Sequence, residues 1–381
     1  MQPIAERFEA VFERPASDIF FAPGRVNLIG EHTDYNDGFV FPCALECGTY
    51  VALAPRSDNQ MQVCAGNFDD EFNVWSLQGA IAQDPSCQWS NYLRGVCAIL
   101  LSQGHALRAM DVYIEGNVPR GAGLSSSASL AVAFTKALSD INHLNLSVGE
   151  VARVAQMAEN DFAGCSCGIM DQLASAGGKD GYALLLDCRD LSFDLVAIAD
   201  SLSIVIIDSR VERNLVGSEY NDRRADCERA AAALGVNSLR DATMELLEQK
   251  REALDALAYR RARHVLTEND RTKRCAAALK AHDLATVYQC MHDSHVSMRD
   301  DFAITVPEID FLVATVDALL DNDGGVRMTG GGFGGCVVAL VPKAKAPAIE
   351  ARVKAGYRAQ FGKEPAVYHG KASDGARRLL C

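Results

Sequence analysis

The chain has 381 residues, of which 49% are hydrophobic and 23% are charged, proportions that suit a folded protein of about two domains. Its net charge of -13 excludes a general binder of nucleic acids or anionic membranes, because both require an accumulated positive field. The sequence contains no run of about 18 apolar residues and its first residues lack a signal-peptide pattern, so neither a membrane span nor export is expected.

The first half of the chain contains a strand-like segment flanked by ionisable side chains. In GRVNLIGEHTDYNDGFV, residues 24–40, a half-buried strand is expected after Arg25 and before Glu31, His32 and Asp34. Ionisable groups beside a core strand are unfavourable unless they are paired. Their partners are either protein groups, such as a salt bridge to Arg25 in a surface turn, or a polyhydroxylated ligand.

The remainder of the first half alternates strand-like and helical segments. Ser147 and Glu150 stand at capping-box spacing before a helical pattern of apolar residues. The expected strands are residues 39–55, 111–116 and 182–188, and the expected helices are residues 124–140 and 147–164.

After about residue 195 the pattern restarts with a strand, and long charged helices follow it. The basic segment YRRARHV, residues 259–265, is expected to form a solvated or salt-bridged helix face because the chain as a whole is acidic. Strand clusters mixed with helices, without strict βαβ alternation, favour α+β lobes. The expected strands are residues 202–209 and 336–342, and the expected helices are residues 218–234, 244–265, 284–302 and 345–361.

The thirteen cysteines indicate the redox compartment. Apart from Cys43/Cys47 and Cys165/Cys167 they are scattered singly, and no CxxC pair occurs. An odd number without such pairs fits neither a disulfide framework nor a zinc site. Free thiols in a reducing cytoplasm are therefore expected.

A glycine- and serine-rich loop, VPRGAGLSSSASL at residues 118–130, lies between a predicted strand and a predicted helix. Gly121 and Gly123 allow backbone N–H groups to approach an anion closely, and the serines that follow add hydroxyls to the free N–H groups of the helix start. The loop can therefore cradle a nucleotide phosphate chain. It is not a Walker A loop, because no lysine follows the glycines. The alternative is an ordinary glycine turn with a serine cap.

A second glycine run, MTGGGFGG at residues 328–335, formally contains G-x-G-x-x-G. A dinucleotide-binding loop would be followed by a helix, whereas CVVALV is a strand, so that interpretation is rejected. Two interpretations remain, a tight hairpin connection and a turn whose backbone approaches a ligand.

Taken together, these motifs resemble those of the GHMP kinases. The segment GRVNLIGEHTDYN is similar to the sugar signature of the galactose-phosphorylating members, GAGLSSSAS to the phosphate motif of the family, and MTGGGFGG to its third motif. Further matches, such as FAGCSCGIMDQLAS and SEYNDRRADCE, extend the resemblance from residue 18 to about residue 340. The chain is therefore identified as a member of this family.

The resemblance implies an α+β fold of two lobes, each a mixed or antiparallel sheet packed with helices, with the active site in the cleft between them. The lobes are expected at residues 1–195 and 196–381, and the last strand may pack back on the first lobe. The implied activity is transfer of the γ-phosphoryl group of ATP to the anomeric hydroxyl of D-galactose. A cytoplasmic monomer that uses Mg²⁺ with ATP, without nucleic-acid or membrane partners, is expected.

By resemblance, Asp171 accepts the proton of the attacking hydroxyl and Arg25 neutralises charge on the transferring group. Ser127 and Glu159 are the implied magnesium ligands, since Mg²⁺ prefers a few oxygen ligands and keeps several waters. The implied sugar contacts are Glu31, His32, Thr33, Asp34, Gly168, Asp171 and Tyr220. The implied ATP contacts are Trp89, Gly121, Ala122, Gly123, Leu124, Ser125, Ser126 and Ser127.

These assignments leave alternatives open. Asp171 could cap a helix, Glu159 could be a solvent-facing charge, and Trp89 could belong to the core. At the level of function, the alternatives are a catalytically inactive regulator that binds galactose and ATP, and a kinase for a related sugar such as N-acetylgalactosamine. The complete serine run at Ser125 to Ser129 favours the enzyme.

Overall fold

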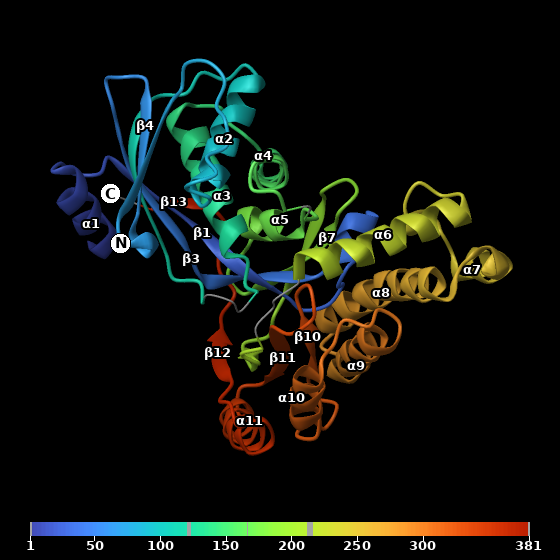
Figure 1. The fold of residues 1–381 in the computed structure, drawn as a ribbon. Helices are drawn as coiled ribbons and strands as arrows, with labels where there is room; N and C mark the ends of the chain where they lie inside the picture. Colours follow the sequence, from blue (N-terminus) through green and yellow to red (C-terminus); the bar gives the residue numbers. More distant parts are fainter. Residues whose placement is uncertain (1, 120–122, 166, 212–215, 380–381) are drawn as a thin grey trace.

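The computed structural model describes residues 2–119, 123–165, 167–211 and 216–379. It is an α+β fold of two lobes (Figure 1). The first lobe has a six-stranded mixed sheet in the order β13-β1-β3-β6-β4-β5 and a small sheet in the order β2-β7-β8. The second lobe has a four-stranded antiparallel sheet in the order β10-β11-β9-β12.

The first lobe contains most of the first half of the chain. Its strands are β1 (Asp18–Asn27), β2 (Phe39–Val40), β3 (Pro42–Pro55), β4 (Gln60–Ala65), β5 (Glu71–Ser76), β6 (Met110–Gly116), β7 (Tyr182–Asp187) and β8 (Phe193–Ala197). Its helices are α1 (Gln2–Phe12), α2 (Ser90–Ser102), α3 (Ser126–Ile141), α4 (Val148–Asp161) and α5 (Met170–Gly177), with the 3-10 helices η1 (Asp34–Asn36) and η2 (Gly66–Phe68). The last strand of the chain, β13 (Arg377–Leu379), pairs with β1.

Both faces of the large sheet are covered, as the alternation of side chains along its strands requires. In β3, Val51 and Leu53 face the core formed with α2 to α5, while Ala52 and Ala54 face α1. The half-buried strand expected after Arg25 needs correction, because Arg25 and Val26 lie inside β1, which ends at Asn27, and every residue of β1 except Asp18 is buried. The reason is that helices and the second lobe together leave no side of β1 open to water.

The second lobe is built from long helices around its sheet. Its strands are β9 (Leu202–Asp208), β10 (Gly325–Thr329), β11 (Cys336–Pro342) and β12 (Ala366–Gly370). Its helices are α6 (Val216–Leu234), α7 (Met244–Gln249), α8 (Ala256–Lys280), α9 (Leu284–Asp300), α10 (Pro307–Asp317) and α11 (Ala346–Phe361), with η3 (Leu239–Asp241) and η4 (Arg251–Ala253). The MTGGGFGG run connects the antiparallel strands β10 and β11, which confirms the hairpin connection.

The single helix expected over residues 244–265 is wrong, because two helices and η4 occupy that region. Asp255 ends the connection, and its carboxylate accepts hydrogen bonds from the N–H groups of Leu257 and Ala258 at the start of α8. Such an N-cap satisfies orphan donors that an uninterrupted helix would not have, so the local chemistry favours a new helix start.

The two lobes share a hydrophobic core. Ile204, Ile206 and Val338 on one face of the second sheet pack in one cluster with Val26 and Phe41 of the first lobe. The opposite face of the second sheet packs on its own helices. The division of the chain into two lobes near residue 195 stays a prediction. Among the described residues, no helix is both long and apolar enough to cross a membrane.

Candidate active site

A cavity of about 510 Å³ lies between the lobes, and it collects most of the residues singled out from the sequence. The strand β1 and the turn after it (residues 28–36, hereafter the β1 turn) form one wall. The start of α3, the end of α4 and the start of α5 form another, and α6 and the β10–β11 connection close it from the second lobe. The predicted site residues that line it are Arg25, Glu31, His32, Asp34, Gly123, Leu124, Ser125, Ser126, Ser127, Glu159, Gly168, Asp171 and Tyr220.

Arg25 and Asp171 form a two-pronged ion pair in this cavity. The Nε and Nη2 atoms of Arg25 donate to the two carboxylate oxygens of Asp171 over 2.7 and 2.6 Å. The Ser125 hydroxyl donates a further, short hydrogen bond to Asp171. Arg25 also donates through Nη1 to the carbonyl of Gly123 and through its backbone N–H to the carbonyl of Leu124. One arginine therefore fixes both the carboxylate and the loop that leads into α3.

The N-terminus of α3 opens on the cavity without a side-chain cap. Ser125 occupies the N-cap position in the left-handed conformation (φ 59°), and its side chain bonds Asp171 and not the first turn of the helix. That conformation is uncommon for serine and signals a constrained site. The free N–H groups and the positive end of the helix dipole therefore remain available to an anion.

A buried carboxylate, Glu159, stands beside this helix start. Its Oε1 accepts from the Ser127 hydroxyl over 2.7 Å, and its Oε2 accepts from Nε2 of Gln172 over 2.8 Å. Glu159 is only 5% exposed, and burial raises the pKa of its carboxyl. No lysine or arginine of the described residues forms an ion pair with it, and the nearby charge of Arg25 only partly offsets the effect of burial on this pKa. Such a carboxylate offers negative charge and oxygen atoms to a cation.

The β1 turn presents further polar groups to the cavity. His32 exchanges a 2.8 Å hydrogen bond with the Tyr35 hydroxyl, and its ring lies 5.3 Å from that of Tyr220 on α6. Burial lowers the pKa of His32 to about 3, so its ring is neutral. Burial, reinforced by the charge of Asp171, raises the pKa of Asp34 to about 7. Uncharged and weakly acidic hydrogen-bonding groups of this kind suit a neutral polar ligand.

Glu31 is anchored by an arginine from the second lobe. Arg327 on β10 is fully buried, and its Nη2 donates to Glu31 Oε2 over 2.6 Å. Its Nη1 donates to the carbonyls of Asn27 and Leu28, and its Nε donates to the hydroxyl of Ser294. The backbone N–H of the glycine that follows β10 donates to the other oxygen of Glu31. The carboxylate is therefore held from the lobe opposite its own.

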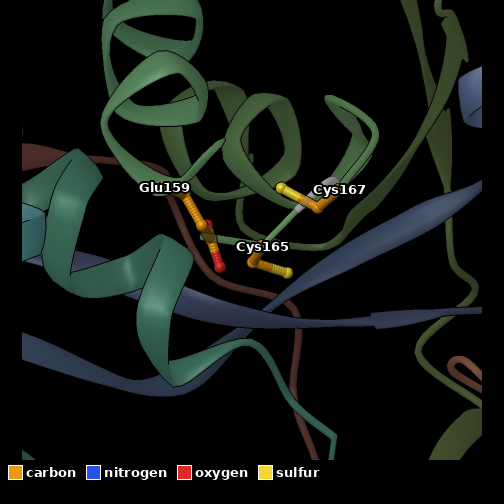
Figure 2. A group of neighbouring side chains, drawn as sticks. All are labelled: Glu159, Cys165 and Cys167. Atoms are coloured by element: carbon orange, nitrogen blue, oxygen red, sulfur yellow. The ribbon is translucent and has the colours of Figure 1, made fainter. Parts of the chain in front are cut away.

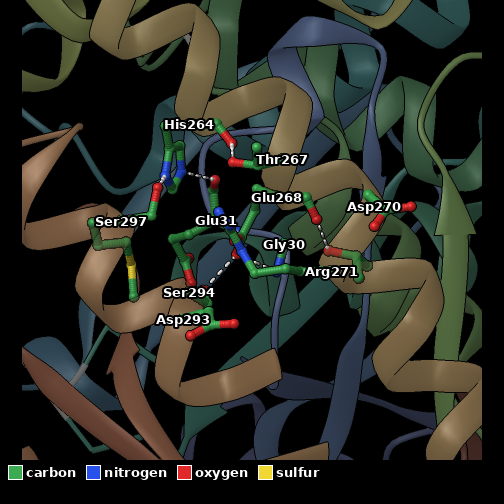
Figure 3. Close-up of polar contacts among 12 residues, drawn as sticks. Gly30, Glu31, His264, Thr267, Glu268, Asp270, Arg271, Asp293, Ser294 and Ser297 are labelled. Carbon is green, nitrogen blue, oxygen red and sulfur yellow. Dashed lines mark hydrogen bonds and ion pairs between the residues drawn. The ribbon is translucent and has the colours of Figure 1, made fainter. Parts of the chain in front are cut away.

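A second anchor comes from α8 (Figure 3). Glu268 Oε1 accepts from the backbone N–H groups of Gly30 and Glu31, at 3.0 and 3.3 Å, and Arg271 pairs with its Oε2 at 2.8 Å. His264 lies 3.1 Å from the carbonyl of Glu31 through Nε2. Although burial opposes ionisation of Glu268, Arg271 and its other cationic neighbours hold its pKa at about 2. A permanent buried charge thus fixes the backbone of the β1 turn.

A second cavity of about 330 Å³ adjoins the first and shares Ser126 and Ser127 with it. Trp89 and Phe68 line it, with ring centroids 6.1 Å apart and a stacked geometry. Nε1 of Trp89 donates to Glu71 over 2.6 Å. A flat aromatic group entering this space would lie next to the N-terminus of α3.

The remaining predicted residues have other positions. The Thr33 hydroxyl donates to the carbonyls of Gly30 and Phe39, so it stabilises the β1 turn from inside and does not line the cavity. Gly121 and Ala122 lie outside the described residues. Asp171 lies in the first turn of α5 and is not its cap, since Ile169 occupies that position.

Sequence reasoning missed the anchoring residues. Arg327, Glu268 and His264 are fully buried, and only Arg327 carried a usable signal, as a lone charge in an apolar strand before glycines. The segment at residues 259–265 is salt-bridged as expected, with Arg261 paired to Asp226. The expectation of a solvated face is wrong for His264, because its ring is buried against the β1 turn.

Known protein families match this chain in three segments. A galactokinase galactose-binding signature matches residues 6–55. The GHMP kinase N-terminal domain matches residues 91–179, and the GHMP kinase C-terminal domain matches residues 275–359. The three matched segments contain the β1 turn, the start of α3 and the β10–β11 connection.

Solved structures agree with these matches. A Lactococcus lactis galactokinase in complex with galactose superposes with a TM-score of 0.94 at 33% identity, covering 99% of each chain. A Methanococcus jannaschii mevalonate kinase (TM-score 0.62, 16% identity, 93% and 98% covered) shares the fold. A Cytophaga hutchinsonii homoserine kinase (TM-score 0.63, 17% identity, 95% and 97% covered) shares it as well.

Proposed function

The chain belongs to the galactokinases of the GHMP kinase family, and from this we propose that it transfers the γ-phosphoryl group of ATP to the anomeric hydroxyl of D-galactose. The products are galactose 1-phosphate and ADP. One observation carries the proposal. The Asp171 carboxylate, which accepts hydrogen bonds from Arg25 and Ser125, lines the cavity between the lobes. The same cavity is lined by the polar side chains of the β1 turn and by the N-terminus of α3, which has no side-chain cap.

The sugar is proposed to lie against the β1 turn. Carboxylates accept hydrogen bonds from adjacent hydroxyls, which is the pattern that a monosaccharide offers. Glu31 and Asp34 supply carboxylates from the first lobe, His32 supplies a ring nitrogen, and Tyr220 supplies a hydroxyl and a ring from α6. The anomeric hydroxyl then lies toward Asp171, which accepts its proton as the hydroxyl attacks.

ATP is proposed to occupy the two adjoining cavities. The phosphates lie at the start of α3, where the free N–H groups bind anions, and the adenine lies in the second cavity beside Trp89. Phosphoryl transfer depends mainly on positioning and charge stabilisation. Arg25 stands at the junction of sugar and phosphate and neutralises the charge that grows on the transferring group.

Mg²⁺ is proposed to accompany ATP, with Ser127 and Glu159 as its protein ligands. The fit rests on a buried carboxylate that forms no ion pair with a basic side chain among the described residues and accepts a hydrogen bond from a hydroxyl over 2.7 Å. When bound, the ion shields phosphate charge and favours in-line transfer. Nε2 of Gln172 donates a hydrogen bond to the second carboxylate oxygen of Glu159 and so fixes the orientation of the carboxylate.

The Glu159→Gln variant is expected to need about tenfold or more Mg²⁺ for half-maximal rate, because a neutral amide is a weaker ligand for a hard cation. Magnesium titrations at fixed ATP would measure this change. Galactose binding in the absence of ATP should be unaltered by the substitution. An unchanged magnesium requirement would remove Glu159 from the proposed ligand set.

Gly168→Ala is expected to raise the KM for galactose about tenfold with little loss of stability. A Cβ atom at Gly168 would lie 1.9 Å from Oδ2 of Asp34, so the carboxylate must turn away from the sugar. Gly168 is not in the positive-φ region, so alanine itself is tolerated there. Steady-state kinetics and thermal unfolding would check both expectations, with Gly149→Ala, a substitution on the outer part of α4, as the control.

Galactose affinity is expected to fall as the pH drops below 7. Burial raises the pKa of Asp34 to about 7, so its carboxyl is ionised above that pH and protonated below it. If the sugar binds the ionised form, affinity declines by up to about tenfold per pH unit below 7, in proportion to the competent fraction. Calorimetric titrations at pH 6 and 8 would measure this, and Asp34→Asn should bind weakly with a flat pH profile.

The activity itself is tested by incubating the protein with galactose, ATP and Mg²⁺ and identifying galactose 1-phosphate by phosphorus NMR. Competition among galactose, glucose, N-acetylgalactosamine and arabinose defines the sugar range. Release of ADP that is independent of any sugar, from folded protein, would contradict the proposal.

A further inference from the structure

A carboxylate and two thiols converge where α4 ends (Figure 2). A carboxylate oxygen of Glu159 and the Sγ atoms of Cys165 and Cys167 (Figure 2) all lie within 4.8 Å of one another. Glu159 is buried, Cys167 is half-buried and Cys165 is exposed. All three residues line the 510 Å³ cavity, so an ion in solution can reach them.

Backbone contacts hold this arrangement in place. The N–H of Cys165 donates to the carbonyl of Glu159 over 3.2 Å, which folds the loop back on the end of α4. The N–H and Sγ of Cys167 both bond Oδ1 of Asn160, at 3.1 and 3.3 Å. The two cysteines are thus brought to Glu159 by the helix end itself.

A fully buried amide supports two of the three groups. Nε2 of Gln172 donates to Glu159 over 2.8 Å and lies 3.5 Å from Sγ of Cys167. Its Oε1 atom is buried without a hydrogen-bond partner among the described residues. Outer partners of this kind orient metal ligands, and an unused acceptor suits a metal-bound water.

We propose that Glu159, Cys165 and Cys167 form a binding site for a thiophilic divalent cation, Zn²⁺ in the first place, and that its occupation inhibits the kinase. Three protein ligands with an open fourth position are typical of zinc, and thiolates select zinc over magnesium. Zinc–sulfur bonds of about 2.3 Å place tetrahedral ligands about 3.8 Å apart, so binding requires these atoms to move together by at most about 1 Å. The exposed side chain of Cys165 can make that shift. Binding releases the two thiol protons to water.

Inhibition follows from the shared carboxylate, and this part rests on the proposed role of Glu159 in holding Mg²⁺. A zinc ion that engages Glu159 draws it away from Ser127 and from the magnesium position. Glu31, Asp34 and the β1 turn are not among the zinc ligands, so galactose still binds. The site therefore couples phosphoryl transfer to the concentration of free thiophilic metal.

Cobalt(II) is the direct probe, because thiolate ligation gives it a charge-transfer band that oxygen ligation lacks. Titration of the full chain without ATP should give this band with one Co²⁺ bound, and Zn²⁺ should displace it. The Cys165→Ser/Cys167→Ser double variant should lose the band, while Cys47→Ser, a half-buried thiol on β3, should retain it. Galactose binding and circular dichroism verify that the double variant is folded.

Kinase assays with galactose then test the inhibition. Wild type should lose activity on addition of Zn²⁺ and recover it with a zinc-selective chelator, and the double variant should need at least about tenfold more Zn²⁺ for the same loss. A missing cobalt band, or a band retained in the double variant, would overturn the site. A band without inhibition would overturn the regulatory role. Since the cobalt titration needs no turnover, it decides the site even for a chain without kinase activity.

Discussion

Asp171→Asn is expected to lower kcat by about 10²–10⁴-fold while leaving galactose affinity within a few-fold. Asparagine has nearly the same shape, and its single oxygen can still accept from Nη2 of Arg25 and from Ser125, but it cannot take the proton of the anomeric hydroxyl. The sugar contacts on the β1 turn are not touched by the substitution. Steady-state kinetics and calorimetric galactose binding, measured on the same preparation, would separate the two effects.

A matched control for this variant is Asp187→Asn. Asp187 also forms an ion pair with an arginine, Arg240, at 2.9 Å, but it lies outside the cavity. Its loss should leave kcat unchanged. An Asp171→Asn enzyme with full activity would show that Asp171 is not the base, and a parallel loss in both variants would point to destabilisation in place of lost chemistry.

Arg327→Met is expected to destabilise the protein by about 3–5 kcal/mol, because it leaves Glu31 as a buried, unpaired charge. Arg327 is 0% exposed and Glu31 is 2% exposed, so water cannot replace the lost partner. The carbonyls of Asn27 and Leu28 lose donors at the same time. Urea unfolding, analysed for the midpoint and the slope, would measure the change in the free energy of unfolding.

The same substitution at an exposed ion pair provides the comparison. Arg274 lies 3.8 Å from Asp270 on the outer face of α8, and Arg274→Met should change stability by no more than about 0.5 kcal/mol. Adding Glu31→Gln to Arg327→Met should recover part of the lost stability, because it removes the unpaired charge. Equal, small effects at positions 327 and 274 would refute the view that the buried pair joins the lobes.

Features that depend on neighbouring residues could be predicted from the sequence. The capping box of α4 forms as expected, with the N–H of Ser147 donating to Glu150 over 2.8 Å. The hairpin at the second glycine run and the helix after the serine run are also confirmed. In each case the interacting groups are close in the sequence, three residues apart in the capping box and seven apart at the closing pair of the hairpin, Thr329 and Cys336.

Features that depend on distant residues could not be predicted in this way. Glu31 and Arg327 are 296 positions apart, and periodicity carries no information on which strand of one lobe will meet a turn of the other. Cys165 and Cys167 are free thiols, as expected, but the sequence does not indicate which other side chains lie beside them. Their third partner, Glu159, belongs to the preceding helix, and only the fold-back after α4 brings it near.

The core shared between the lobes has a consequence for how substrates enter. Swinging the lobes apart would expose Ile204, Ile206 and Val338 to water together with Val26, which is strongly unfavourable for a surface of this kind. A hinge at the floor of the cleft is therefore not available to this protein. Galactose and nucleotide must therefore enter and leave through movements of the residues around the cavity opening. The shared core stays rigid and keeps Arg25 and Glu31 at fixed positions relative to each other.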